Sequence, residues 1–239
     1  MIGIVGGIGA GKSAVAAALA ARGAFVIDAD KVGHALLNQP PVLERVLSRF
    51  GPEVLATPGE DGAPRTIDRR VLGTVVFNDP AARKALESIL HPRMRSTFAK
   101  AIARTIRRGR ATAVVLDAAI LFEAGWHTLC DRVLFVEAPL ATRIRRLASE
   151  RGWTEEKLLV RERTQAPLEE KRAKAFAVVA NSDGPEALEA EVDRVWQSVL
   201  ASPPPPRRSG AAVGVRATSQ GSRPKAPGPR SRPSGRGGR

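Results

Sequence analysis

The segment Gly6-Gly-Ile-Gly-Ala-Gly-Lys-Ser13 constrains the fold of this chain more than any other stretch. It fits the phosphate-loop pattern G-x-x-x-x-G-K-[ST], with the glycines, the lysine and the serine in the required places. Residues 2–5 are apolar and predict a short strand before the loop, and residues 13–22 predict a helix after it. A strand, a glycine-rich loop and a helix in this order form the phosphate-binding site of such proteins, so we expect a nucleoside triphosphate to bind here.

The residue types in the loop match this chemistry. Glycines let successive backbone N–H groups point at a phosphate, and the N-terminus of the following helix adds partial positive charge. Lys12 can reach the β- and γ-phosphates, and the Ser13 hydroxyl can ligate Mg²⁺. The predicted phosphate-binding residues are Gly7, Ile8, Gly9, Ala10, Gly11, Lys12, Ser13 and Ala14.

Length and composition allow a single α/β domain with a sizeable insertion among the 239 residues. The single cysteine, Cys130, excludes an intrachain disulfide and a multi-cysteine metal site, and we expect it to be a small buried residue. No signal peptide and no run of about 18 apolar residues is visible. We therefore expect a cytoplasmic protein without a membrane partner.

The net charge of +14 is concentrated at the C-terminus. Residues 203–239 carry nine of these charges and no acidic side chain, and they are rich in Pro, Gly and Ser. Such a segment cannot bury enough apolar surface to offset its ordering entropy, so we predict a disordered basic tail. It can bind polyanions weakly, but we expect no specific nucleic-acid partner.

A second strand is predicted over residues 24–28, and it ends in Asp28-Ala29-Asp30. In extended backbone the two carboxylates would project to the same side, at the carboxyl end of the strand and near the phosphate loop. One could then accept a proton from an attacking hydroxyl while the other positions Mg²⁺. The alternative is that Asp30 only caps the next helix.

Residues 36–110 are predicted to be helical, with helices over 41–50, 69–77, 80–90 and 92–108 and a loop over 51–66. This exceeds an ordinary crossover between strands and suits an insertion that covers a second substrate. His91 precedes Pro92 and is expected in extended backbone at the junction of two helices. A structural junction and a substrate contact are equally compatible with His91.

Three further strands are predicted over 111–117, 131–137 and 177–180. Asp117 ends the first of them and can act on Mg²⁺ through a bound water. A two-helix lid is predicted over the arginine-rich segment 139–151 and the segment 154–165. Its arginines would neutralise charge on a transferred phosphoryl group. The alternative is that they form only a solvated basic face. A final amphipathic helix over 186–200 places Trp196 on the sheet.

Taken together, these residues resemble the dephospho-coenzyme A kinase family over about residues 1–200. The phosphate loop alone is generic, but its combination with D-A-D and with L-H-P inside a helical insertion is specific. The matching segments are 6–13, Val26-Ile-Asp-Ala-Asp30, Phe50-Gly51, Arg69-x-x-Leu72, Val76-Phe77, Leu86-Glu87, Ile89-Leu-His-Pro92, Leu121-Phe-Glu123, Arg146-Leu147, Arg161 with Gln165, and Asn181.

The resemblance implies transfer of the γ-phosphoryl group of ATP to the ribose 3′-hydroxyl of dephospho-CoA, with ATP and Mg²⁺ as cofactors. It implies that Asp30 is the general base, that Lys12 and the lid arginine Arg146 assist catalysis, and that Gly9, Gly11 and Ser13 contact phosphate and Mg²⁺. It further implies that Asp28 and His91 contact the acceptor. We expect a monomer that binds these two small molecules.

The expected architecture is an α/β P-loop kinase fold, a five-stranded mostly parallel sheet flanked by helices. The core would comprise residues 1–35 and 111–202, the acceptor-binding insertion about 36–110, and the lid about 139–165. The chain departs from the family pattern at three places. Ala119-Ile120 stand where the family usually has Pro-Leu. Glu150 stands where the family often has a second lid arginine, and Phe176 stands where it usually has an acid.

Three other functions compete with this interpretation. Another small-molecule P-loop kinase, for a nucleoside, sugar or shikimate-like acceptor, would share the loop and lid but would not need the long insertion. A GTP-binding switch is disfavoured because residues 30–33 satisfy D-x-x-G without any N-K-x-D motif. A nucleic-acid-binding protein would act through the basic tail and bind RNA in a salt-sensitive manner.

Overall fold

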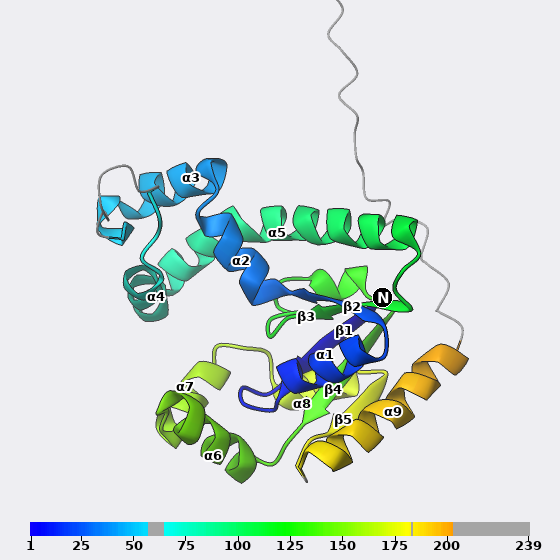
Figure 1. Cartoon of the computed structure of the whole chain (residues 1–239). Helices are drawn as coiled ribbons and strands as arrows, with labels where there is room; N and C mark the ends of the chain where they lie inside the picture. Colours follow the sequence, from blue (N-terminus) through cyan, green and yellow to red (C-terminus); the bar gives the residue numbers. More distant parts are fainter. Residues whose placement is uncertain (57–64, 183, 203–239) are drawn as a thin grey trace, which may run out of the picture. The chain divides into compact units, whose positions relative to one another are not determined.

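The computed structural model describes residues 1–56, 65–182 and 184–202, which belong to one compact unit (Figure 1). The predicted basic tail, residues 203–239, lies outside the described residues, and so does part of the predicted loop over 51–66. The disorder of the tail therefore stays a prediction.

A five-stranded sheet lies at the centre of the unit, and its strand order is β2-β3-β1-β4-β5. The strands are β1 (Ile2–Gly6), β2 (Ala24–Asp28), β3 (Ala113–Asp117), β4 (Arg132–Glu137) and β5 (Ala177–Ala180). Every pair is parallel, and Ile4 on β1 lies opposite Asp117 on one side and Leu134 on the other. The predicted sheet is thus confirmed, and it is parallel throughout these strands.

One face of the sheet is covered by α1 (Lys12–Ala21) and α9 (Pro185–Ala201), as Figure 1 shows. Ile2 and Ile4 point to this face, and Leu19 and Trp196 pack against them. Trp196 is buried, as predicted. The strands read as continuous apolar runs because both faces of a parallel sheet are covered.

The opposite face is covered by the C-terminal half of α5 (Pro80–Arg108), by the segment after β3 with its 3-10 turn η2 (Trp126–Leu129), and by α8 (Leu168–Ala173). Phe98 on α5 meets the Trp126 ring edge to face, with the ring centroids 5.0 Å apart.

Cys130 lies partly buried beside this second core. Burial raises the pKa of its thiol to about 12, so the side chain is uncharged at neutral pH. A thiol that stays protonated is a poor nucleophile, which agrees with the expected role as a small apolar residue.

The insertion has a core of its own. It is built from α2 (Ala29–Leu37), α3 (Pro40–Phe50), the 3-10 turn η1 (Pro52–Val54), α4 (Arg69–Asn78) and the first turns of α5. Aspartates at positions 68 and 79 accept backbone N–H groups and cap α4 and α5. The buried side chains are Leu37, Val42, Leu43, Val46, Val54, Ile67, Leu72 and Ile89.

The prediction of two helices separated at His91-Pro92 is wrong. A single helix, α5, runs from Pro80 to Arg108 with Pro92 inside it, and His91 is helical rather than extended. A proline inside a helix removes one hydrogen bond and costs about 3 kcal/mol. Here Ile89 is buried in the insertion core before the proline and Met94 on the sheet face after it, and burial on both sides offsets that cost.

The two expected lid helices are present as α6 (Leu140–Arg151) and α7 (Glu155–Glu162). Gly152 ends α6 in the left-handed region at φ 60°, and the Thr154 hydroxyl caps α7 by accepting the N–H of Lys157. Across the described ranges, no helix combines the length and the apolar character that a membrane crossing requires.

Candidate active site

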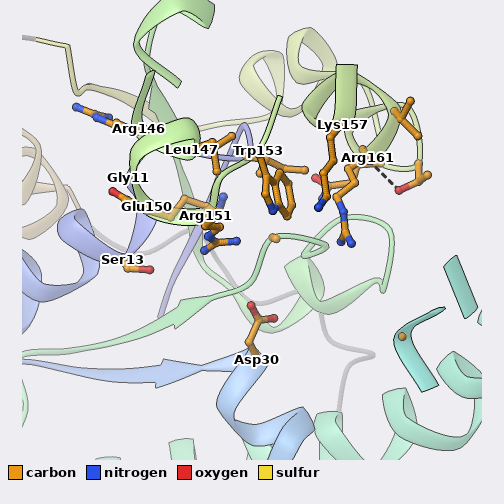
Figure 2. A pocket seen from close by; sticks show the side chains of 18 of the residues that line it. Gly11, Ser13, Asp30, Arg146, Leu147, Glu150, Arg151, Trp153, Lys157 and Arg161 are labelled. Carbon is orange, nitrogen blue, oxygen red and sulfur yellow. Dashed lines mark hydrogen bonds between the residues drawn. The ribbon is translucent and has the colours of Figure 1, made fainter. Parts of the chain in front are cut away.

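A cavity of about 1550 Å³ opens at the carboxyl end of the sheet, where parallel α/β sheets bind their ligands. The phosphate loop and the ends of β2 and β3 form its floor, and α4, α6 and α7 form its walls. Figure 2 shows Ser13 and Asp30 on the core side, with Arg151 and Arg161 facing them from the lid.

Two glycines of the loop have backbone angles that favour glycine strongly. Gly9 and Gly11 have φ values of 78° and 88°, in the left-handed region. A Cβ atom on Gly11 would also lie only 2.1 Å from the side-chain nitrogen of Asn181. The backbone and the close approach at Gly11 explain why the pattern requires glycine at that position, whereas Gly9 occupies a variable position of the pattern.

The Lys12 ammonium group lies over the loop and donates to the carbonyls of Gly6 and Gly7, at 3.2 and 3.1 Å. Burial lowers the pKa of Lys12, while the nearby Asp117 carboxylate acts in the opposite direction. A cation that is partly stripped of water interacts strongly with a phosphate placed against the loop.

Asp117 ends β3 next to the loop, where the Ser13 hydroxyl hydrogen-bonds its carboxylate. Burial raises the pKa of Asp117, and the Lys12 ammonium opposes that rise. A hydroxyl and a carboxylate are oxygen ligands, the type that Mg²⁺ prefers. No group of three metal-ligating side chains occurs among the described residues.

The prediction that Asp28 and Asp30 project together from one strand is wrong. β2 ends at Asp28, and the chain turns directly into α2, whose first turn carries Asp30. Asp28, rather than Asp30, caps this helix, because its Oδ1 accepts the N–H of Lys31 at 2.9 Å. Both carboxylates nevertheless line the cavity, and Asp30 is exposed to it and faces the lid (Figure 2).

Arg146 lines the cavity with its guanidinium held against the phosphate loop. Its guanidinium donates to the main-chain oxygen and to Oδ1 of Asn181, at 3.0 and 3.2 Å, and to the carbonyl of Ala10 at 3.4 Å. Asn181 is buried and donates its own Nδ2 to the same carbonyl at 2.8 Å. The sequence indicated Asn181 only as part of a family pattern and not as the partner of Arg146.

The lid arginines serve different purposes. Arg143 is buried and forms an ion pair with Glu162, which joins α6 to α7. The same two side chains bind both main-chain groups of Ile8: Arg143 donates to its oxygen at 3.3 Å, and Glu162 accepts its N–H at 3.1 Å. Arg143 therefore supports the loop from the lid side, whereas Arg146, Arg151 and Arg161 line the cavity.

Sequence reasoning missed a buried cation beneath the site. Lys171 on α8 is fully buried, and its ammonium contacts Glu123 at 2.8 Å, Gln165 at 3.0 Å and the carbonyl of Ala119 at 3.2 Å. Glu123 also accepts the N–H of Ala166 at 2.8 Å. These contacts join the end of the lid to the segment that follows Asp117. Lys171 stands between Glu170 and Arg172 in a charged segment that is typical of a solvated surface, so the sequence gave no sign of this role.

A second, more apolar cavity of about 310 Å³ adjoins the first on the insertion side and shares Asp30 and Ala119 with it. His91 lines this second cavity, and its ring packs edge-on against Trp126 at 5.1 Å. Burial lowers the pKa of His91, so the imidazole is neutral at pH 7. Asp28 lines only the first cavity, so the structure does not bring the two predicted acceptor residues together.

Comparisons with known sequences identify the family. A family model described as dephospho-CoA kinase matches residues 1–186. The dephospho-CoA kinase of Frankia casuarinae is 42% identical over 201 residues, which cover 84% of this chain and 83% of that protein. The enzyme of the same name from Anaeromyxobacter dehalogenans is 40% identical over 196 residues, covering 82% of this chain and 90% of that protein.

Comparisons with solved structures give the same result. The crystal structure of TT1252 from Thermus thermophilus has a TM-score of 0.68 and 38% identity, covering 84% of this chain and 95% of that one. The dephospho-CoA kinase from Campylobacter jejuni has a TM-score of 0.60 and 25% identity, covering 83% and 96%.

These matches confirm the predicted P-loop kinase fold and the family indicated by the motifs. The matched range, residues 1–186, includes the phosphate loop, Asp30, the insertion with His91, and the lid with Arg146. It covers more than half of the 239 residues. The chain belongs to the dephospho-CoA kinase family.

Proposed function

We propose that the protein transfers the γ-phosphoryl group of ATP to the ribose 3′-hydroxyl of dephospho-CoA, which gives coenzyme A and ADP in the last step of coenzyme A synthesis. One observation carries this proposal: Asp30 lines both the cavity of the phosphate loop and the adjoining apolar cavity of the insertion. A carboxylate between a donor site and an acceptor site is placed to accept the proton of the attacking hydroxyl.

Asp30 acts as the general base in this proposal. Phosphoryl transfer depends mainly on alignment and on stabilisation of charge, so it needs no covalent intermediate on the protein. The exposure of Asp30 to the cavity supports the role, because no helix cap or ion pair engages its carboxylate among the described residues.

Lys12 and Arg146 stabilise negative charge on the phosphates. Both cations already lie on the loop, bound through main-chain oxygens and, for Arg146, through Asn181. Because their positions are set before the nucleotide arrives, little reorganisation is needed during the reaction. The loop residues from Gly7 to Ala14 contact the phosphates of ATP.

Mg²⁺, when bound, neutralises phosphate charge and orients the transferred group. In this chain Ser13 would ligate it directly and Asp117 through water, as the oxygen ligands described above support. Asp28 and His91 would contact the nucleotide part of the acceptor, although from separate cavities.

The test is the release of ADP from ATP and Mg²⁺ with dephospho-CoA, adenosine, shikimate or gluconate as acceptor, beside a control without acceptor. Turnover with dephospho-CoA alone, yielding a product phosphorylated on the ribose 3′-hydroxyl, is the expected result. Turnover with another acceptor would refute the proposed substrate, and ADP release without acceptor would indicate an NTPase.

The cytoplasmic location and the monomeric state stay predictions from the sequence. Size-exclusion chromatography with light scattering tests the monomeric state, and the mass of a dimer would contradict it.

A further inference from the structure

Arg161 on α7 lies between aromatic rings from two different parts of the protein. Its guanidinium carbon is 4.8 Å from the centre of the Trp153 ring, in the lid, and 5.0 Å from the centre of the Phe77 ring, on α4 of the insertion. Figure 2 shows Trp153, Lys157 and Arg161 side by side on the lid, across the cavity from Asp30.

The guanidinium group of Arg161 has no polar partner among the residues that the structure describes. Its Nε–H is buried and donates to no acceptor, and within the described ranges no carboxylate pairs with Arg161. Lys157, whose ammonium lies 5.2 Å from the centre of the same Trp153 ring, is likewise without an ion pair there. Removing part of the Arg161 guanidinium from water without pairing it is unfavourable, so Arg161, with the exposed Lys157 ammonium beside it, is suited to receive an anion.

We propose that Arg161 binds a phosphate group of the acceptor and so acts as a residue that determines acceptor affinity. The inference rests on the proposed function, because dephospho-CoA carries a diphosphate away from the hydroxyl that reacts. A planar guanidinium forms two parallel hydrogen bonds with phosphate oxygens and can keep its faces stacked on aromatic rings.

The position of Arg161 favours the acceptor over ATP. The triphosphate has its own cations at the loop, Lys12 and Arg146. Figure 2 shows Arg146 on the opposite side of the view from Arg161. Arg161 instead contacts Phe77, and α4 also lines the second, apolar cavity through Gly73 and Val76. An anion at Arg161 would thus be held next to the insertion.

Phe77 and Trp153 have a supporting role. Phe77 is 46% exposed, which is high for a phenylalanine, and its partner across the cavity is the Arg161 guanidinium. Cation–π contacts with both rings limit the directions in which the guanidinium can point. They thereby orient Arg161 toward the cavity before the acceptor arrives.

The experiment compares Arg161→Met with Arg163→Met, a matched control because Arg163 is exposed at the end of the same helix and does not line the cavity. KM is measured for dephospho-CoA and for ATP, and the Kd of dephospho-CoA is measured directly by calorimetry without ATP. For Arg161→Met we expect KM and Kd for dephospho-CoA to rise roughly 10- to 100-fold, with KM for ATP changed less than about 2-fold. The control should match the wild type.

A conservative variant and a stacking variant keep the test independent of folding. Arg161→Lys keeps the charge but loses the planar fork, and Phe77→Leu removes one ring, so each should raise the Kd for dephospho-CoA by a smaller factor, roughly 2- to 10-fold. A thermal unfolding midpoint equal to that of the wild type shows that the effect is on binding.

Three results would overturn the inference: an unchanged Kd for dephospho-CoA in Arg161→Met, a rise in KM for ATP alone, or equal effects of Arg161→Met and Arg163→Met. A wild-type protein that binds dephospho-CoA without phosphorylating it would refute the proposed function instead. The comparison of Kd values would still decide the role of Arg161 in that case.

Discussion

Arg146 of the lid is hydrogen-bonded to both oxygens of Asn181, the main-chain oxygen at 3.0 Å and Oδ1 at 3.2 Å. Asn181 follows β5 and also donates to the Ala10 carbonyl, so one buried amide joins the lid, the sheet and the phosphate loop. A position fixed in this way lets the arginine meet a phosphate with little loss of side-chain entropy.

Asn181→Ala tests whether this amide acts through Arg146. We expect kcat to fall roughly 10-fold, because Arg146 loses its hydrogen bond to Oδ1 and the Ala10 carbonyl loses the bond from Nδ2, which together loosen Arg146 on the loop. In the background of Arg146→Met the same substitution should have little further effect on kcat, since neighbouring residues that act as a unit are not additive. Equal effects in both backgrounds, measured by steady-state kinetics, would contradict the coupling.

Asp30→Asn tests the general base. The amide cannot accept the proton of the attacking hydroxyl, so kcat should fall roughly 10²- to 10⁴-fold while the Kd of ATP changes little. Glu44→Gln is the control, because Glu44 is exposed on α3 and forms only a surface ion pair with Arg65. An unchanged kcat in Asp30→Asn would remove Asp30 from the mechanism.

Lys171→Met tests the buried cation beneath the site. Removing the ammonium leaves the Glu123 carboxylate without its partner, so the free energy of unfolding in urea should fall by about 3 kcal/mol. Adding Glu123→Gln should recover part of this loss, because the unpaired charge is then gone. Lys174→Met, at an exposed ion pair with Glu170, should cost less than about 1 kcal/mol. Equal losses in the two lysine variants would show that the buried contacts contribute nothing.

His91 predicts a specific acid sensitivity. Its pKa is below the ordinary value of 6.5 because the imidazole is buried. As the pH falls through 6.5, His91 is protonated in the unfolded chain before it is protonated in the folded protein. The free energy of unfolding therefore decreases below pH 6.5, and His91 adds no pH dependence above it. The free energy of unfolding of His91→Gln should therefore fall less between pH 7.5 and 5.5 than that of the wild type. A slope unchanged from that of the wild type would contradict this, and His34→Gln, at an exposed histidine, is the control.

Local patterns in the sequence predicted the sheet, the phosphate loop and the family. The spacing of Gly6, Gly11, Lys12 and Ser13 is read directly from the chain, and continuous apolar runs mark strands that are covered on both faces. The backbone at Asp30 and His91 was predicted wrongly, because burial at Ile89 and Met94 outweighed the proline signal and because the chain became helical directly after Asp28.

The partners of the arginines could not be predicted, because they depend on contacts between residues far apart in the chain. Arg143, Arg146, Arg151 and Arg161 look alike as exposed charges on a basic lid. Only the fold shows that Arg143 pairs with Glu162 and that Arg146 is hydrogen-bonded to Asn181. It also shows that Arg161 lies between two aromatic rings.

The continuity of α5 has a mechanical consequence. This helix of 29 residues belongs to the insertion core at Ile89 and to the sheet face at Phe98 without a break. The insertion can therefore move relative to the sheet only by bending a helix. The lid, in contrast, is joined to β4 by a short loop at Pro139 and to α8 by one that ends at Pro167. On the lid side, any change in the width of the site must break the contacts that Arg143 and Arg146 make with Ile8 and Asn181.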